Sequence, residues 1–172
     1  MKNPLEAAHA LPKGAAILLR HTDSGARAHL AHTLKPIVRR RGLYLIIAGD
    51  AALAARINAD GLHLPEVRAR EARHLRALHP SWLITAAAHS ARAIGVATQA
   101  GADAVLLAPV FATRSHKERA PLGAPRSRLI AAEAKIAVYV LGGIHAKNAA
   151  RLKGARLAGI AAIDGLLPDH NA

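Results

Sequence analysis

Cysteine is absent from the 172-residue sequence, and aromatic residues make up only 2% of it. The first absence excludes disulfides, thiolate metal ligands and a cysteine nucleophile, and it fits a reducing compartment. The second leaves little surface on which the bases of single-stranded nucleic acid could stack. No apolar run reaches the ~18 residues of a membrane span, and the start MKNPLEAAHALPKG lacks the apolar region of a signal peptide. We therefore predict a cytoplasmic protein without a membrane-spanning segment.

Positive charge is in excess, since 24 Lys and Arg stand against 11 Asp and Glu and give a net charge of +13. Such an excess attracts phosphorylated small molecules, nucleic acids or acidic membrane surfaces, or it forms a solvated arginine-rich surface. The only tight run is Arg39–Arg41, whereas a groove-binding helix would concentrate the charge. We therefore favour a phosphorylated small molecule over nucleic acid as the partner. The sequence leaves a homodimer open.

Short aliphatic runs recur along the chain and are apolar on both faces, as in parallel strands covered on both sides. Apolar residues make up 52% of the sequence, which suits one folded domain over residues 1–172. The predicted strands are Ala15–Leu19, Leu43–Ala48, Gly61–Leu64, Trp82–Ala86, Ala104–Ala108, Ile136–Leu141 and Gly159–Ile163.

The segments between these runs fit helices, and several carry capping residues. The predicted helices are 24–41, 50–58, 66–78, 90–100, 126–134 and 145–153, with a further short helix at 4–10. The predicted caps are Ser24, Asp50 and Ser90 at helix starts, and Gly42, Gly101 and Gly154 just past helix ends.

Alternating strands and helices of this kind predict right-handed parallel crossovers and the α/β class. We predict a TIM (β/α)₈-type barrel that lacks the first β-strand, because only seven strands are countable and the chain starts with a helix. A barrel explains why polar motifs follow several strands all round the chain, which an open doubly wound sheet would not. A truncated or misassigned start, or a partner subunit that completes the barrel, would account for the missing strand.

Two loops after predicted strands have the composition of anion sites. Gly142 and Gly143 lie in Leu141–Ile144, where backbone amides and a following helix could hold a phosphate, or where the glycines serve a tight turn only. The segment 108–117 carries Thr113, Ser115, His116 and Lys117, and it could close over an anionic substrate or remain a basic surface loop.

Three further side chains are candidates at strand ends. Arg20 ends the first predicted strand and suits bidentate contact with phosphate or carboxylate. His63 lies inside a strand among apolar neighbours, so it is either a packing residue or a ligand contact. His89 follows a strand as a catalytic base or an ordinary loop residue. Metal ligands are sparse, since Asp50 and Glu66 have no acidic neighbour, and only Asp50 is a weak candidate.

Taken in order, these segments resemble the thiamine phosphate synthase family, which includes the thiazole tautomerases. The resemblance spans about Gly14 to Leu166. It rests on the motifs Leu18-Leu19-Arg20, Ala59-Asp60-Gly61-Leu62-His63-Leu64, Ala88-His89-Ser90, Pro109-Val110-Phe111-Ala112-Thr113 and Leu141-Gly142-Gly143-Ile144.

This resemblance implies a TIM barrel that joins hydroxymethylpyrimidine diphosphate to thiazole phosphate and releases diphosphate, with Mg²⁺ as the cofactor. On the same ground, Arg20 matches the arginine of the pyrimidine-diphosphate side, to which we also assign His63 and His89. Thr113 and Ser115 match the hydroxyls that bind thiazole phosphate. His116 stands for the following lysine, with Lys117 beside it, and Gly143 matches the phosphate-binding glycine next to Gly142.

Several positions depart from the family pattern. The family's glutamine falls on Leu18, its lysine on Thr22 and its Asn-Asp pair on Ala48-Gly49. Its second metal aspartate falls on Arg68 and its serine on Ala87. The Mg²⁺ ligands are therefore largely absent, and Asp50 could substitute only by a shift of one residue. Ile163-Asp164 replaces a Val-Ser pair, so that the Asp164 carboxylate would repel phosphate and Asp164→Ser should tighten its binding. The tautomerase histidine corresponds to Pro109.

The sequence therefore leaves several functions open. One is a thiamine-phosphate-synthase-type transferase, whose catalysis the replaced metal positions place in doubt. A second is a non-catalytic or regulatory relative that binds a phosphorylated ligand, which the lost side chains favour. A thiazole tautomerase-like isomerase and a polyanion-binding barrel are further alternatives.

Overall fold

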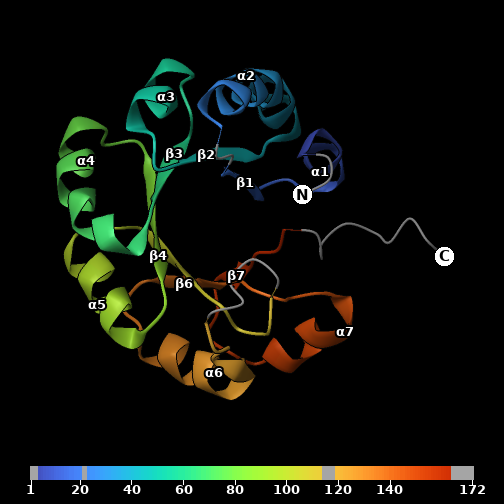
Figure 1. Ribbon diagram of the computed structural model, residues 1–172, viewed down its shortest axis with the longest axis vertical. Helices are drawn as coiled ribbons and strands as arrows, with labels where there is room; N and C mark the ends of the chain where they lie inside the picture. The colour runs from blue at the N-terminus through green and yellow to red at the C-terminus, as the bar shows by residue number, and fades with distance from the viewer. Residues whose placement is uncertain (1–3, 21–22, 114–118, 164–172) are drawn as a thin grey trace.

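The computed structural model describes residues 4–20, 23–113 and 119–163. Its centre is a parallel sheet of seven strands in the order β1 to β7, which curls as the helices wrap around its outer side (Figure 1). The strands are β1 Ala16–Leu19, β2 Tyr44–Ala48, β3 Gly61–Leu64, β4 Leu83–Ala88, β5 Ala104–Leu107, β6 Ala137–Val140 and β7 Gly159–Ile160. The predicted α/β fold of TIM-barrel type is confirmed.

Helices connect successive strands, as the alternating pattern predicted. They are α1 Pro4–Ala10, α2 Ser24–Arg41, α3 Ala51–Arg56, α4 Ala72–Leu78, α5 Ala91–Gln99, α6 Gly123–Glu133 and α7 Ala146–Ala149, with 3₁₀ helices at Glu66–Glu71 and Ala150–Leu152. None of the helices described here is both long enough and apolar enough to cross a membrane.

Two of the three predicted N-caps are confirmed and one is wrong. Asp50 and Ser90 cap α3 and α5 through hydrogen bonds to the amides of Leu53 and Ala93. The predicted cap Ser24 is wrong, because Asp23 is the N-cap of α2 and its carboxylate accepts from the Ala26 amide at 2.6 Å. A carboxylate one residue earlier reaches this amide and is also favoured by the helix dipole.

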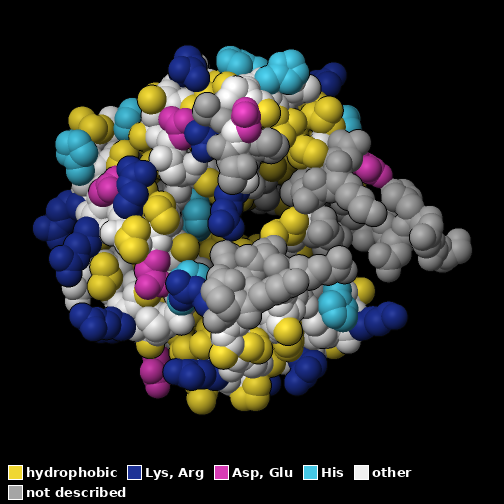
Figure 2. All heavy atoms as spheres, in the orientation of Figure 1, with side chains coloured by type: hydrophobic (Ala, Val, Ile, Leu, Met, Phe, Trp, Pro, Cys, Tyr) yellow, Lys and Arg dark blue, Asp and Glu magenta, His cyan; other side chains and the backbone are white. Residues whose placement is uncertain are grey.

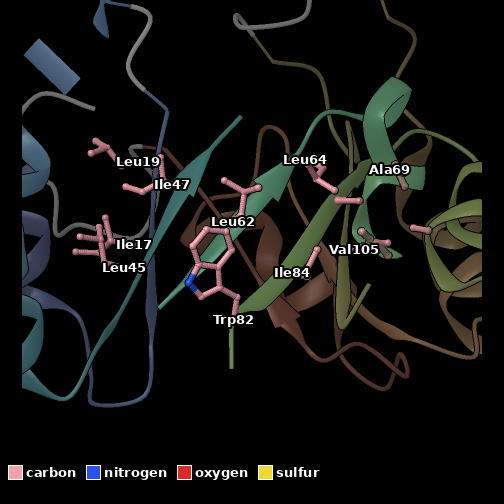
Figure 3. Close-up of a cluster of buried hydrophobic side chains, with 14 of the residues drawn as sticks. Ile17, Leu19, Leu45, Ile47, Leu62, Leu64, Ala69, Trp82, Ile84 and Val105 are labelled. Atoms are coloured by element: carbon pink, nitrogen blue, oxygen red, sulfur yellow. The ribbon is translucent and has the colours of Figure 1, made fainter. Parts of the chain in front are cut away.

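The main core lies between the sheet and the helices. Leu45, Ile47, Leu62, Leu64 and Ile84 point from β2, β3 and β4 to this side and are at most 2% exposed. Figure 3 shows these side chains converging with those of β1 and Trp82. Full burial of each large aliphatic side chain is worth about 1.5–3 kcal/mol. This layer therefore holds the sheet in its curved form.

The concave side of the sheet is covered less completely than the strand pattern predicted. Tyr44, Leu83 and Tyr139 alternate with the core residues of β2, β4 and β6, yet they are 44%, 36% and 38% exposed. In the described ranges, β1 and β7 are the two edges of the sheet and do not pair with each other. The sheet described here is therefore open along one side, a point that the sequence left undecided, and these three inner side chains meet solvent.

Candidate functional site

Polar residues from distant parts of the chain gather at the carboxyl ends of the strands. Arg20 follows β1, Asp50 follows β2, His89 follows β4, and the double glycine follows β6. Parallel strands bring all of these loops to one end of a barrel. Figure 2 shows a central hollow in the molecule, with basic and histidine side chains at its wall.

His63 and Thr85 form a polar pair on the inner side of the sheet. They are register partners on β3 and β4, both are buried, and His63 Nδ1 lies 2.9 Å from Thr85 Oγ1. Burial and, to a smaller extent, the nearby Arg20 guanidinium together lower the pKa of His63 to about 4. His63 is therefore neutral at pH 7, and Arg20 is the positive charge beside it.

This buried histidine gives a testable pH dependence of stability. An unfolded histidine takes up a proton near pH 6.5, whereas His63 in the folded protein stays neutral down to about pH 4. The free energy of unfolding should therefore fall by roughly 3 kcal/mol as the pH drops through this window. Chemical denaturation of native protein and His63→Gln at several pH values checks this. The variant should show the shallower slope, and equal slopes would contradict the assignment.

His89 is fixed by hydrogen bonds at the carboxyl end of β4. Its Nδ1–H donates to the Ala108 carbonyl oxygen at 2.6 Å, and its backbone amide donates to Glu66 Oε2 at 2.8 Å. A carbonyl can only accept, so His89 Nδ1 carries a proton. His89 is therefore fixed in position at the carboxyl end of the barrel, in part by the Glu66 carboxylate.

The double glycine is clasped against the loop after β5. Val110 and Phe111 donate backbone hydrogen bonds to the carbonyls of Leu141 and Gly142, both at 3.0 Å. Gly143 has φ +62°, and a Cβ there would lie 2.3 Å from the Ala112 carbonyl oxygen. Only glycine allows this close approach. Glycine is therefore required at position 143 for steric reasons, which is one of the two roles that the sequence left open.

The amides of this loop also lack acceptors within the described part of the protein. Across the described residues, the backbone N–H groups of Gly142, Gly143 and Ile144 donate to no protein acceptor. Gly142 and Ile144 are buried, and Gly143 is half-buried. Buried N–H groups nearly always have a partner. Successive unpaired backbone amides are the kind of donors that bind anions in proteins.

The helix after this loop contributes less than the sequence predicted. α7 is one turn long and continues as a 3₁₀ helix. The Asn148 side chain accepts from the His145 amide at 2.9 Å, and its Nδ2 donates to the Gly143 carbonyl at 2.8 Å. The short helix adds little dipole, and Asn148 instead fixes the peptide of Gly143.

The remaining predicted phosphate contacts are described only in part. Thr113 is half-buried at the end of the loop that clasps the double glycine, and Ile163 is exposed after β7. In the same loop as Thr113, the ring of Phe111 lies 5.3 Å from the Arg151 guanidinium. The predicted site residues Ser115, His116, Lys117 and Asp164 lie outside the described residues.

The residues at the β2 and β3 ends do not fit Mg²⁺. Asp50 is occupied, because Oδ1 accepts from the Leu53 amide at 2.9 Å and Oδ2 pairs with Arg27 at 2.8 Å. Arg68 places a guanidinium at this edge and donates to the Gly49 carbonyl at 3.1 Å. Within the described ranges, no three His, Asp or Glu side chains converge on one point. Mg²⁺ needs free oxygen ligands, and both oxygens of Asp50 already accept hydrogen bonds.

Sequence reasoning missed several of these contacts. Arg68 forms a bidentate pair with Glu71 at 2.7 Å for each bond, which raises the pKa of Arg68 and lowers that of Glu71. The spacing of three residues on one helix could have suggested this pair. Thr85, in contrast, carries no local signal, because its partner His63 comes from the neighbouring strand.

These features define an open parallel β/α barrel with unpaired backbone amides at the carboxyl end of β6. A family model described as thiamine monophosphate synthase matches residues 3–166, and the chain belongs to this family.

Individual relatives agree with this assignment. A thiamine-phosphate synthase of Thioalkalivibrio sulfidiphilus is 32% identical over 174 residues, which cover 96% of this chain and 82% of that protein. One from Synechococcus sp. (strain WH7803) is 29% identical over 88% of this chain. Thiamine phosphate pyrophosphorylase from Pyrococcus furiosus superimposes with a TM-score of 0.75 at 22% identity, over 92% of this chain and 75% of its own. This last likeness supports the fold.

The chain spans only part of some relatives. The match covers 43% of the Synechococcus protein and 61% of a related protein from Aquifex aeolicus.

Proposed function

We propose that this protein binds a phosphorylated small molecule of the thiazole phosphate class at the loop 141–144, without joining it to a pyrimidine diphosphate. The observation that carries the proposal is the row of unpaired amides at Gly142, Gly143 and Ile144. A phosphate group accepts several hydrogen bonds at once, so it would satisfy donors that have no partner within the described part of the protein. Membership of the thiamine monophosphate synthase family supports thiazole phosphate as the ligand.

The charge distribution supports an anionic ligand. The net charge of +13 draws anions toward the molecule, and Arg20 adds a guanidinium beside the neutral His63. A neutral imidazole can accept or donate one hydrogen bond without competing for the anion's charge. The ligand is therefore bound mainly by backbone amides, with arginine as the charged contribution.

The same geometry argues against the condensation reaction. A departing diphosphate needs its developing charge neutralised, and the expected oxygen ligands for Mg²⁺ are held by Arg27 or replaced by Arg68. The guanidinium of Arg68 is itself paired with Glu71, so it does not take over this task. The isomerase alternative lacks its proton acceptor, because Pro109 occupies the position of the tautomerase histidine.

Thermal unfolding with thiazole phosphate tests the proposed binding. At 100 times its dissociation constant, a ligand that binds only the folded protein raises the free energy of unfolding by ~2.7 kcal/mol. We expect a stabilisation that saturates with thiazole phosphate, and a weaker one with inorganic phosphate. The unphosphorylated thiazole alcohol serves as the matched control and should give no shift. An unchanged transition temperature with thiazole phosphate up to millimolar concentration would contradict the proposal.

A further inference from the structure

The amino ends of the strands carry a contact that recurs along the chain. Asp60 lies directly before β3, and Leu45 is the second residue of the neighbouring β2. The Asp60 amide donates to the Leu45 carbonyl at 2.9 Å, and Asp60 Oδ2 accepts from the Leu45 amide at 2.7 Å. This reciprocal pair satisfies both backbone groups of Leu45 at a point where the ladder between β2 and β3 has not yet begun.

The same reciprocal pair joins β4 and β5. Asp103 lies directly before β5, and Ile84 is the second residue of β4. The Asp103 amide donates to the Ile84 carbonyl at 2.8 Å, and Asp103 Oδ2 accepts from the Ile84 amide at 2.7 Å. In both units the carboxylate also pairs with a cation from the helix before the first strand. This cation is Lys35 of α2 for Asp60. It is Arg76 of α4 for Asp103.

The third unit, β6 to β7, has this arrangement without the carboxylate. Ala158 lies directly before β7, and its amide donates at 2.9 Å to the carbonyl of Val138, the second residue of β6. The carbonyl and the amide of one strand residue point to the same side, so the Val138 N–H is also directed at position 158. Within the described part of the chain, that N–H donates to no protein acceptor. Val138 is 2% exposed, and buried N–H groups nearly always have a partner.

The third unit has kept its cation. Arg128 of α6 lies ten positions before Val138, which is the spacing between the cation of α2 and its strand residue. Its Nη2 lies 3.7 Å from the place of a Cβ on Gly154, in the loop before β7. Arg128 forms no ion pair with any residue that the structure describes. A buried donor and a free guanidinium therefore remain where the other units hold a carboxylate.

We propose that the space beside Ala158 binds a small carboxylate anion, which takes the place of the side chains of Asp60 and Asp103 in the other units. One oxygen of the anion accepts from the Val138 amide, and Arg128 balances its charge. Ala158 and Arg128 are exposed, so an anion reaches this position from solvent. The site lies at the amino end of β6, whereas the double glycine follows the carboxyl end of the same strand. Its occupation therefore does not depend on whether thiazole phosphate binds.

Formate tests the site, because it is a carboxylate without further groups. In a ¹⁵N–¹H spectrum of the full chain, the Val138 amide signal is followed during titration with sodium formate. Sodium chloride at the same ionic strength is the comparison. We expect the signal to move along a saturating curve with formate and to stay in place with chloride. A signal that moves no further with formate than with chloride would overturn the proposal.

A carboxylate supplied by the chain itself gives an independent measurement. Ala158→Asp should restore the third reciprocal pair, raise the transition temperature by about 3 to 6 °C and abolish the response of Val138 to formate. Ala158→Asn, which has the same shape without the charge, should raise the temperature less. Ala120→Asp adds the same charge at an exposed loop position and is the matched control. It should unfold close to the native temperature and keep the response to formate.

The two measurements can contradict the proposal separately. The formate titration uses the native chain, so it remains decisive if Ala158→Asp does not fold. A folded Ala158→Asp variant that is no more stable than Ala120→Asp, and whose Val138 signal still responds to formate, would show that no carboxylate is bound beside position 158.

Discussion

No thiamine phosphate above the uncatalysed background is expected when this protein is mixed with hydroxymethylpyrimidine diphosphate, thiazole phosphate and Mg²⁺. The physical reason is the donor set at the ends of β2 and β3. Asp50 has both oxygens engaged by Leu53 and Arg27, and the Arg68 guanidinium lies against the Gly49 carbonyl. An ion that must neutralise a leaving diphosphate finds no pair of free carboxylates there.

The assay needs high protein concentration and a positive control. The thiamine-phosphate synthase of Thioalkalivibrio sulfidiphilus, 32% identical to this chain, is a suitable one. Product formation by the control and none by this protein is the expected pair of results. Turnover that rises in proportion to the concentration of this protein and stops on addition of EDTA would show that the misfit of Mg²⁺ has been misjudged.

Substitution of Gly143 by alanine should both destabilise the fold and abolish binding of thiazole phosphate. At φ +62° a side chain costs about 1 kcal/mol, and the added Cβ would lie 2.3 Å from the Ala112 carbonyl oxygen. Moving that backbone costs about 1–3 kcal/mol more and displaces the amides of Gly142 and Ile144. Chemical denaturation measures the first effect, and calorimetry with thiazole phosphate measures the second.

Gly49 provides the matched control for this substitution. It has φ +71°, but an added Cβ there meets nothing within 4 Å. Gly49→Ala should therefore lose only the conformational term of about 1 kcal/mol and keep its affinity for thiazole phosphate. If the two variants lost equal stability and both retained ligand, the close packing of the two loops would not be what positions the amides.

Much of the fold could be predicted, because the residues that specify each strand and helix end are neighbours in the sequence. The strand Gly61–Leu64 has the predicted bounds, and Gly42 has the left-handed conformation expected at the end of α2. The start of α6 was not predictable. It begins at Gly123 instead of residue 126, because the amides of Leu122 and Gly123 donate to the carbonyls of Pro109 and Val110. Such contacts depend on tertiary structure.

The candidate site could also be predicted only in part from the sequence. Arg20, His89 and the double glycine could be placed at one end of the barrel from the alternation of strands and helices alone. The hydrogen bond between His63 and Thr85, and the contact of Arg68 with the Gly49 carbonyl, join residues about twenty positions apart. No sequence pattern specifies them, because they depend on strand register and on the path of the chain after β3.

The central claim is that main-chain amides at the end of β6 hold a phosphate group. Its most direct test is a titration of ¹⁵N-labelled protein with thiazole phosphate, observing the backbone amide signals of Gly142, Gly143 and Ile144. We predict that these three signals move furthest, along one saturating curve, and that the unphosphorylated alcohol leaves them unchanged. Signals that stay in place while resonances elsewhere shift would contradict the claim.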